Sequence, residues 1–132
     1  MSWNIDLNTS AITMHRGDTG AYYACLALDS EEPFEDGDVA IYEVCQGNIV
    51  KIHREFSLYD AEDDEEVPNG KQILIAFRNS DTDTWNAGTY QTEIRVVLNP
   101  KRIGTAVKDG DVVRTPPETK STLTIVGTLI DI

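Results

Sequence analysis

The sequence predicts an all-β domain in which two sheets pack face to face as a sandwich. Apolar and polar residues alternate with period two, turn residues interrupt this alternation about every 8–12 residues, and no stretch of a dozen residues has helical periodicity. We expect seven to nine short antiparallel strands and helices of at most one turn. The 132 residues fit a single domain, 1–132, that needs no metal or disulfide to fold.

The first expected element is an N-terminal arm, residues 1–9, in which Trp3, Ile5 and Leu7 alternate with polar residues. This arm either forms a first strand of the domain's own sheet, which we favour, or adds to the edge of a neighbouring protein's sheet. The next strand, Ala21–Leu28, is apolar on both faces. We therefore expect it to be central and well covered.

The remaining strands each follow a turn signal and place apolar residues on one face. The clearest is Thr89–Leu98, and its polar face carries Gln91, Glu93 and Arg95. Asp109-Gly110 is predicted to be the tip of a hairpin that joins Glu93–Leu98, through residues 100–108, to the next strand. Three other predicted strands are Val39–Cys45, Val112–Thr115 and Ser121–Ile132, the last with a bulge near Gly127. Two more strands are predicted from the apolar residues on one face: Val50, Ile52 and Phe56 in one, and Ile73, Ile75 and Phe77 in the other.

Two short segments are predicted to be single helical turns. They are Leu58–Asp63 and Ser80–Trp85, and Ser80 or Asp81 caps the second. Both are too short to form a helical layer. They therefore leave the all-β prediction unchanged.

The net charge of −12, from 23 acidic and 11 basic residues, narrows the classes of partner. A nucleic-acid binder needs a basic face, and so does a protein that binds anionic membranes. We expect neither activity. The N-terminus lacks the basic start and apolar stretch of a secretory signal, so we expect the chain to be kept in a cytoplasm unless it leaves in a particle.

Cys25 and Cys45 both lie in predicted strands. In a chain without an export signal, buried free thiols are expected more often than a disulfide. A bridge stays open as an alternative if the two strands are neighbours. No cysteine spacing indicates a zinc site.

A five-residue motif opens the clearest strand. The segment Asn86-Ala87-Gly88-Thr89-Tyr90 resembles the entry into strand F of immunoglobulin-like domains. The resemblance implies an immunoglobulin-like β-sandwich and a tyrosine corner, in which the Tyr90 hydroxyl bonds back to the preceding backbone. Asn86 stands where the family has an acidic residue, and Thr92 where antibody domains have cysteine, so the antibody class itself is not implied.

A second motif, Ile12-Thr13-Met14-His15-Arg16-Gly17-Asp18-Thr19, combines with that entry and with the closing strand Ser121–Ile125. Together they resemble the N-terminal domain of phage and prophage baseplate upper proteins. The resemblance implies a structural or adaptor role in a phage tail, with other tail and baseplate proteins as partners and a homo-oligomer in the particle. It also implies a location in the bacterial cytoplasm during assembly and in the virion afterwards. Because the chain ends where the family's stalk would begin, docking is expected rather than receptor carrying.

Arg16-Gly17-Asp18 also spells the tripeptide that integrins recognise. We expect a structural role instead, because nothing in the sequence indicates export. In that role Gly17 adopts a backbone angle reserved for glycine, Arg16 pairs with a carboxylate, and Asp18 caps the turn.

The sequence contains no convincing catalytic or cofactor motif, and we expect neither an enzyme nor a bound cofactor. The acidic run Asp60–Glu66 lacks the glycine of an EF-hand loop, so a solvated loop is expected and a different calcium loop is the alternative. His15 and His53 have no paired nucleophile. Two other function classes stay open: a carbohydrate-binding module with a row of exposed aromatics, and a small hydrolase with paired carboxylates.

Three apolar residues are candidates for contacts with a partner protein: Trp3, Ile5 and Trp85. Trp85 precedes the strand F entry and belongs either to the core or to an exposed rim. Trp3 and Ile5 belong to the N-terminal arm, so their role depends on which sheet that arm joins.

Overall fold

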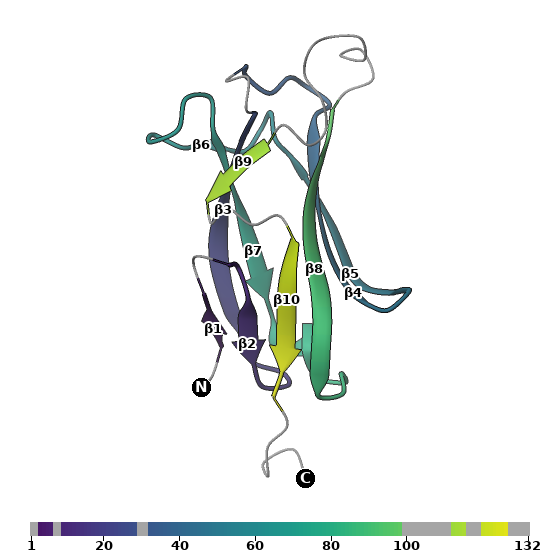
Figure 1. The fold of residues 1–132 in the computed structure, drawn as a ribbon. Helices are drawn as coiled ribbons and strands as arrows, with labels where there is room; N and C mark the ends of the chain where they lie inside the picture. The colour runs from purple at the N-terminus through teal and green to yellow at the C-terminus, as the bar shows by residue number, and fades with distance from the viewer. Residues whose placement is uncertain (1–2, 7–8, 29–31, 99–111, 116–119, 127–132) are drawn as a thin grey trace.

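The computed structural model describes residues 3–6, 9–28, 32–98, 112–115 and 120–126, and these residues form a two-layer β-sandwich (Figure 1). The all-β prediction is confirmed. The described residues contain ten strands rather than seven to nine, because two of them are only two residues long. In chain order the elements are β1 (Asn4–Ile5), β2 (Ile12–Met14), β3 (Gly20–Leu28), β4 (Val39–Gln46), β5 (Ile49–Ser57), β6 (Glu62–Asp63), β7 (Lys71–Phe77), α1 (Asn79–Thr82), β8 (Gly88–Val97), β9 (Val112–Thr115) and β10 (Lys120–Ile125).

One layer is a six-stranded sheet in the order β1-β2-β10-β8-β4-β5, and the other is a four-stranded sheet in the order β6-β7-β3-β9. The strand pairs are antiparallel except that β2 runs parallel to β10. The prediction of a wholly antiparallel sandwich is therefore wrong at this pair. Strands from opposite ends of the chain meet here, and no short hairpin connection forces them to be antiparallel.

The hydrophobic core lies between the two sheets and follows the alternation of the sequence. Ala40, Tyr42 and Val44 of β4 are buried, and they face Ile75 and Phe77 of β7. The rings of Tyr42 and Phe77 meet edge to face with their centroids 6.3 Å apart. This aromatic pair joins the two sheets across the core.

Strand β3 is covered on both faces only in its second half. Cys25 is buried although it points away from the core, because the loop between β5 and β7 covers it, and Ala27 on the same face is buried as well. Tyr23, two residues earlier on the same face, is 57% exposed. The prediction of a fully covered strand is correct for Cys25–Leu28 and wrong at Tyr23.

A β-bulge in β5 changes which residues face the core. Val44 of β4 pairs with Ile52, while Cys45 pairs with Val50, so Lys51 is an extra residue in the ladder. Ile52 is buried as predicted, but Val50 pairs with an outward-facing residue and is 51% exposed. The prediction for Val50 is wrong because one extra residue reverses the alternation before it.

Two predicted segments differ from the structure. Leu58–Asp63 is not a helical turn: Leu58 is fully buried, and Glu62–Asp63 forms strand β6 against β7. Val112–Thr115 is a strand, but it pairs with β3 of the other sheet and not with β8. The hairpin prediction is therefore wrong in its pairing, while its tip at Asp109-Gly110 and the suggested bulge near Gly127 lie outside the described residues.

The short helix α1 begins one residue earlier than predicted. Arg78 is its N-cap, and the backbone N–H of Arg78 donates a hydrogen bond to Asp81 Oδ2 at 2.7 Å. Asp81 therefore stabilises the helix start from the third helical position, and neither Ser80 nor Asp81 is the cap itself. This acidic residue also complements the helix dipole.

The N-terminal arm joins the domain's own six-stranded sheet, as we favoured. Asn4 and Ile5 of β1 pair with Thr13 and Ile12 of β2. The Trp3 ring lies on the backbone of Gly20, where a Cβ atom would sit only 2.1 Å from the indole. Glycine at position 20 is thus what allows the arm to pack closely.

Candidate functional site

The tyrosine corner expected from the resemblance is present. The Tyr90 hydroxyl donates a hydrogen bond to the carbonyl oxygen of Asn86 at 2.7 Å, and the Tyr90 ring packs on Trp85 with centroids 4.8 Å apart. Gly88 has φ +147°, and a Cβ there would meet no atom within 4 Å. The requirement for glycine at position 88 is therefore one of backbone conformation.

The turn Arg16-Gly17-Asp18 is fixed to the segment that carries α1. Gly17 has φ +78°, and its backbone N–H donates to Thr82 Oγ1 at 2.9 Å. Asn79 Nδ2 donates to the carbonyl oxygen of Gly17 at 2.9 Å. Asp18 Oδ2 accepts from the backbone N–H of His15 at 2.8 Å, which confirms the predicted turn cap.

Arg16 differs from the prediction in its partner. Its Nε donates to the carbonyl oxygen of Trp85 at 2.6 Å, rather than to a carboxylate. The Asp18 carboxylate is already held by the turn itself, whereas the Trp85 carbonyl lies just beyond the end of α1. The tripeptide therefore serves as an internal clamp between the β2–β3 turn and the β7–β8 connection.

A second contact holds the β7–β8 connection, and it comes from β5 of the six-stranded sheet. The Arg54 guanidinium, on β5, donates to the carbonyl oxygen of Ala76 and pairs with Asp81 Oδ2 at 2.9 Å. Burial acts to raise the pKa of Asp81, but the Arg78 backbone N–H and the Arg54 charge outweigh it and hold that pKa below its ordinary value. Arg54 thus links the two sheets through a charged hydrogen bond.

The outward side of the six-stranded sheet carries charged side chains around an apolar stripe, and we refer to this surface as the β4 face. Along β4, Val39, Ile41 and Cys45 form a half-buried apolar stripe that Glu43 interrupts. Charged side chains from three other strands border the stripe. The β4 face consists of Val39, Ile41, Glu43 and Cys45 of β4, Val50, His53 and Glu55 of β5, Gln91, Glu93, Arg95 and Val97 of β8, and Lys120 of β10.

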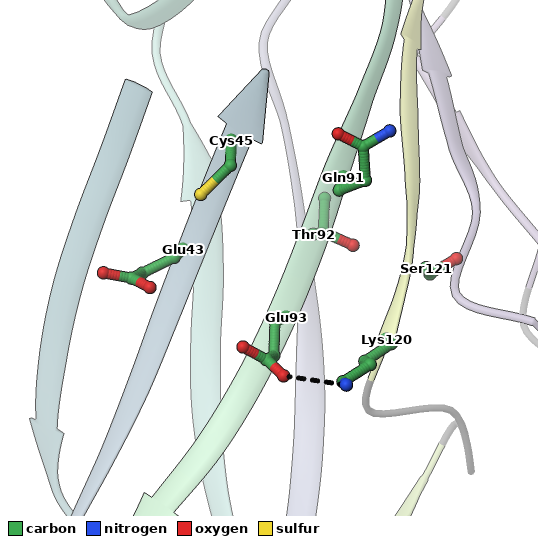
Figure 2. Close-up of a pocket in the computed structure, with 7 residues that line it drawn as sticks. All are labelled: Glu43, Cys45, Gln91, Thr92, Glu93, Lys120 and Ser121. Carbon is green, nitrogen blue, oxygen red and sulfur yellow. Dashed lines mark ion pairs between the residues drawn. The ribbon is translucent and has the colours of Figure 1, made fainter. Parts of the chain in front are cut away.

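Two carboxylates stand directly opposite each other on this face. Glu43 and Glu93 are cross-strand partners. Repulsion between their like charges would by itself destabilise this pairing. Arg95 relieves it, because its guanidinium lies 3.5 Å from Glu43 and 3.6 Å from Glu93. Figure 2 shows Glu93 pointing toward Lys120, at 3.6 Å, while Glu43 points away from Glu93 toward β5.

His53 completes the network on β5. Its Nδ1 lies 2.6 Å from Glu43 Oε2, and its Nε2 lies 2.9 Å from Glu55 Oε2. These hydrogen bonds, first that of Glu55 and then that of Glu43, raise the pKa of His53 above its ordinary value of 6.5. The face thus joins four strands through alternating acidic and basic groups.

The raised pKa of His53 leads to a direct test. We expect an NMR titration of the imidazole to give a pKa above 6.5, and Glu55→Gln and Glu43→Gln each to lower it. Because the folded pKa exceeds the unfolded one, the stabilisation is fully present below about pH 6.5 and is lost as the pH rises through the folded pKa. Glu62→Gln, on distant β6, is the control and should leave the titration unchanged. An unshifted pKa in the wild type would contradict this network.

A hollow of about 250 Å³ lies within the β4 face (Figure 2). It is smaller than the roughly 300–1,000 Å³ of typical small-molecule sites. Its lining includes the Cys45 thiol, whose pKa is raised by burial and by the nearby Glu43 and Glu93 carboxylates. A raised pKa keeps this thiol protonated and therefore weakly nucleophilic.

A second hollow, of about 420 Å³, is lined by acidic residues of the β6–β7 loop and by Gln72. Among the described residues, no three His, Cys, Asp or Glu side chains are grouped so as to hold a metal ion. Asp64 instead accepts hydrogen bonds from the Glu66 backbone N–H and from Gln72. The calcium alternative for Asp60–Glu66 therefore gains no support from this geometry.

Both cysteines are free thiols, as predicted, but only Cys25 is buried and Cys45 is half-buried. Cys25 lies in the four-stranded sheet and Cys45 in the six-stranded sheet, so their strands are not neighbours. Burial, together with the hydrogen bond to Asp64, raises the pKa of Cys25 to about 12. The same contact holds the pKa of Asp64 below its ordinary value.

The three candidate contact residues lie against the domain's own core. Trp85 is 6% exposed, which settles its placement in favour of the core. Trp3 and Ile5 are partly buried and pack against the same core. A role for Trp3 and Ile5 in partner contacts stays a prediction.

The ionic network of the β4 face is absent from the sequence predictions. The alternation marked Gln91, Glu93 and Arg95 as a polar face, and this is confirmed. The partners of these residues depend on the register between β4, β5 and β8, which alternation within one strand does not reveal. Glu43, the one charged residue within β4, was the signal in the sequence that could have indicated this network.

The fold and the β4 face together define the chain as a β-sandwich with a mixed apolar and charged sheet surface. No family model matches the chain, and no curated protein or solved structure is detectably similar to it. Within the described residues, no helix is both long and apolar enough to cross a membrane.

Proposed function

We propose that this chain is an immunoglobulin-like adaptor domain of a phage or prophage tail, and that it works by docking other proteins on its β4 face. The observation that carries the docking role is the apolar stripe of β4 with its charged border. Phage tails are assembled from repeated protein contacts, which suit a domain of this kind.

The composition of the β4 face supports docking. Protein interfaces combine an apolar centre with a polar rim. Here Val39 and Ile41 supply the centre, and Val97 and Val50, which are 38% and 51% exposed, extend it at both ends. The carboxylates, Arg95, Lys120 and His53 supply a rim that can impose orientation on a partner.

The immunoglobulin-like assignment and the tail location rest on the resemblance in the sequence. Two structural features are in keeping with it. They are the tyrosine corner at Tyr90 and the parallel pairing of β2, near the N-terminus, with β10, the last strand described. The clamp formed by Arg16-Gly17-Asp18 gives that motif a role within the fold.

The two other function classes have less support. A carbohydrate-binding module calls for aligned exposed aromatics, but Tyr23 lies on β3 and Tyr59 in the loop that follows β5. A hydrolase with paired carboxylates would need them free to react, whereas Arg95 pairs with both Glu43 and Glu93. Neither class is favoured by an observation on the described residues.

Co-elution with tail proteins tests the proposal. The purified domain is mixed with phage tail and baseplate proteins encoded beside its own gene, and complexes are separated by size exclusion. We expect one of these proteins to co-elute, and Ile41→Glu to weaken that complex about tenfold or more because it buries a charge at the interface centre.

The control is Leu74→Glu, which places the same charge on an outward position of the opposite sheet, where Leu74 is 45% exposed. This variant should bind like the wild type. Equal loss of binding in both variants would contradict docking on the β4 face. Failure of every tail protein to bind would overturn the adaptor role.

A further inference from the structure

We infer that the β4 face binds the β4 face of a second copy of this chain, with the two sheets face to face and their strands antiparallel. This inference rests on the proposed docking role of the face and names a second copy as an occupant, so that copy and a tail protein would compete for the same surface. The observation that carries the inference is the arrangement of charges on either side of the β4 stripe.

The charges flanking β4 form a checkerboard. In the row that crosses Glu43, the neighbour on β5 is His53 and the neighbour on β8 is Glu93. In the row that crosses Ile41, the neighbour on β5 is Glu55 and the neighbour on β8 is Arg95. Protonated His53 and Arg95 thus lie diagonally opposite each other, and so do the two carboxylates.

A checkerboard is complementary to its own rotated copy. A two-fold axis in the plane of the interface, perpendicular to the strands and between these two rows, places each strand over its counterpart in reverse. Arg95 then faces the second copy's Glu93, and His53 faces its Glu55. On β4 itself Glu43 faces Ile41, and Val39 faces Cys45, so the apolar ends of the two stripes meet and no like charges are opposed.

The overall charge of the chain makes this face the best place for two copies to meet. Each copy carries a net charge of −12, so contact through the acidic loops would be repulsive. The β4 face is close to neutral, since Glu43, Glu55 and Glu93 are matched by Arg95, Lys120 and protonated His53. An isologous interface of this kind also closes after two subunits.

Pairing through the edge of the same sheet is a weaker alternative. β5 is the long edge strand, but the bulge at Lys51 interrupts its ladder. The Lys51 ammonium lies 5.8 Å from the centroid of the Trp85 ring. Bulges and charges on edge strands are the features that prevent edge-to-edge pairing.

Sedimentation equilibrium of the full chain, in mildly acidic buffer that protonates His53, tests the inference. We expect the wild type to dimerise at micromolar to near-millimolar concentration. Arg95→Glu and Glu93→Arg should each weaken the dimer about tenfold or more, because each opposes like charges across the axis. An equimolar mixture of the two variants should recover the dimer, since each then faces opposite charges.

Recovery in the mixture shows that both variants are folded and that Arg95 contacts Glu93 of the second copy. Arg78→Glu makes the same change of charge at an exposed residue outside the β4 face and should leave the dimer intact. A monomeric wild type, or a mixture that stays monomeric although the wild type dimerises, would overturn the inference. Co-elution with a tail protein in either case would leave the adaptor role standing, so the two failures are distinguishable.

Discussion

Replacing Tyr42 by alanine is expected to destabilise the domain by about 3–5 kcal/mol, because it opens a cavity between the two sheets. Tyr42 is 1% exposed and packs edge to face on Phe77 across the sandwich. The lost contacts belong to both sheets, and the rigid β-ladders on either side limit collapse into the space. Urea unfolding followed by tryptophan fluorescence measures the change.

Tyr23→Ala is the matched control, since it removes the same side chain from the outward face of β3. Tyr23 is 57% exposed, so we expect a change of about 1 kcal/mol or less. Similar destabilisation by the two variants would mean that Tyr42 does not lie between packed sheets, and the sandwich itself would be in question.

Gly17→Ala is expected to destabilise the domain by about 2–3 kcal/mol. The φ of +78° strains any residue with a Cβ, and that Cβ would lie 2.8 Å from Asn79 Nδ2. Moving Asn79 away breaks its hydrogen bond to the Gly17 carbonyl and disturbs the bond from Gly17 to Thr82. The clamp on the β7–β8 connection would therefore loosen along with the turn.

Gly47→Ala separates backbone strain from loss of the clamp. Gly47 has φ +59°, and a Cβ there would meet no atom within 4 Å. We expect only the strain cost, about 1 kcal/mol. If thermal or urea unfolding gave the same loss at both glycines, the contacts of Gly17 with α1 would contribute nothing to stability.

Most of the fold could be predicted from the sequence because burial of one sheet face imposes period two. The strands around Ile75 and Ile94 were recognised in this way, and both residues are buried. The failures lie where pairing between distant segments decides the outcome. The bulge at Lys51 reversed the orientation of Val50, and β9 pairs with β3 instead of following β8.

Less of the candidate site could be predicted, for the same physical reason. The motif at Tyr90 was readable because its hydrogen bond to Asn86 is local in the chain. The partner of Arg16 was not, because the Trp85 carbonyl is 69 residues away. The network of Glu43, His53 and Arg95 likewise exists only once three strands are placed in register.

The most direct test of the account is an NMR map of the bound surface. The ¹⁵N-labelled domain is titrated with the tail protein that co-elutes with it, and shifted amide signals are assigned. Docking through the six-stranded sheet predicts that the shifts concentrate at Ile41, Arg95 and Val97. Shifts centred on Tyr23 and Leu74, with the signals of Ile41 and Arg95 unmoved, would contradict it.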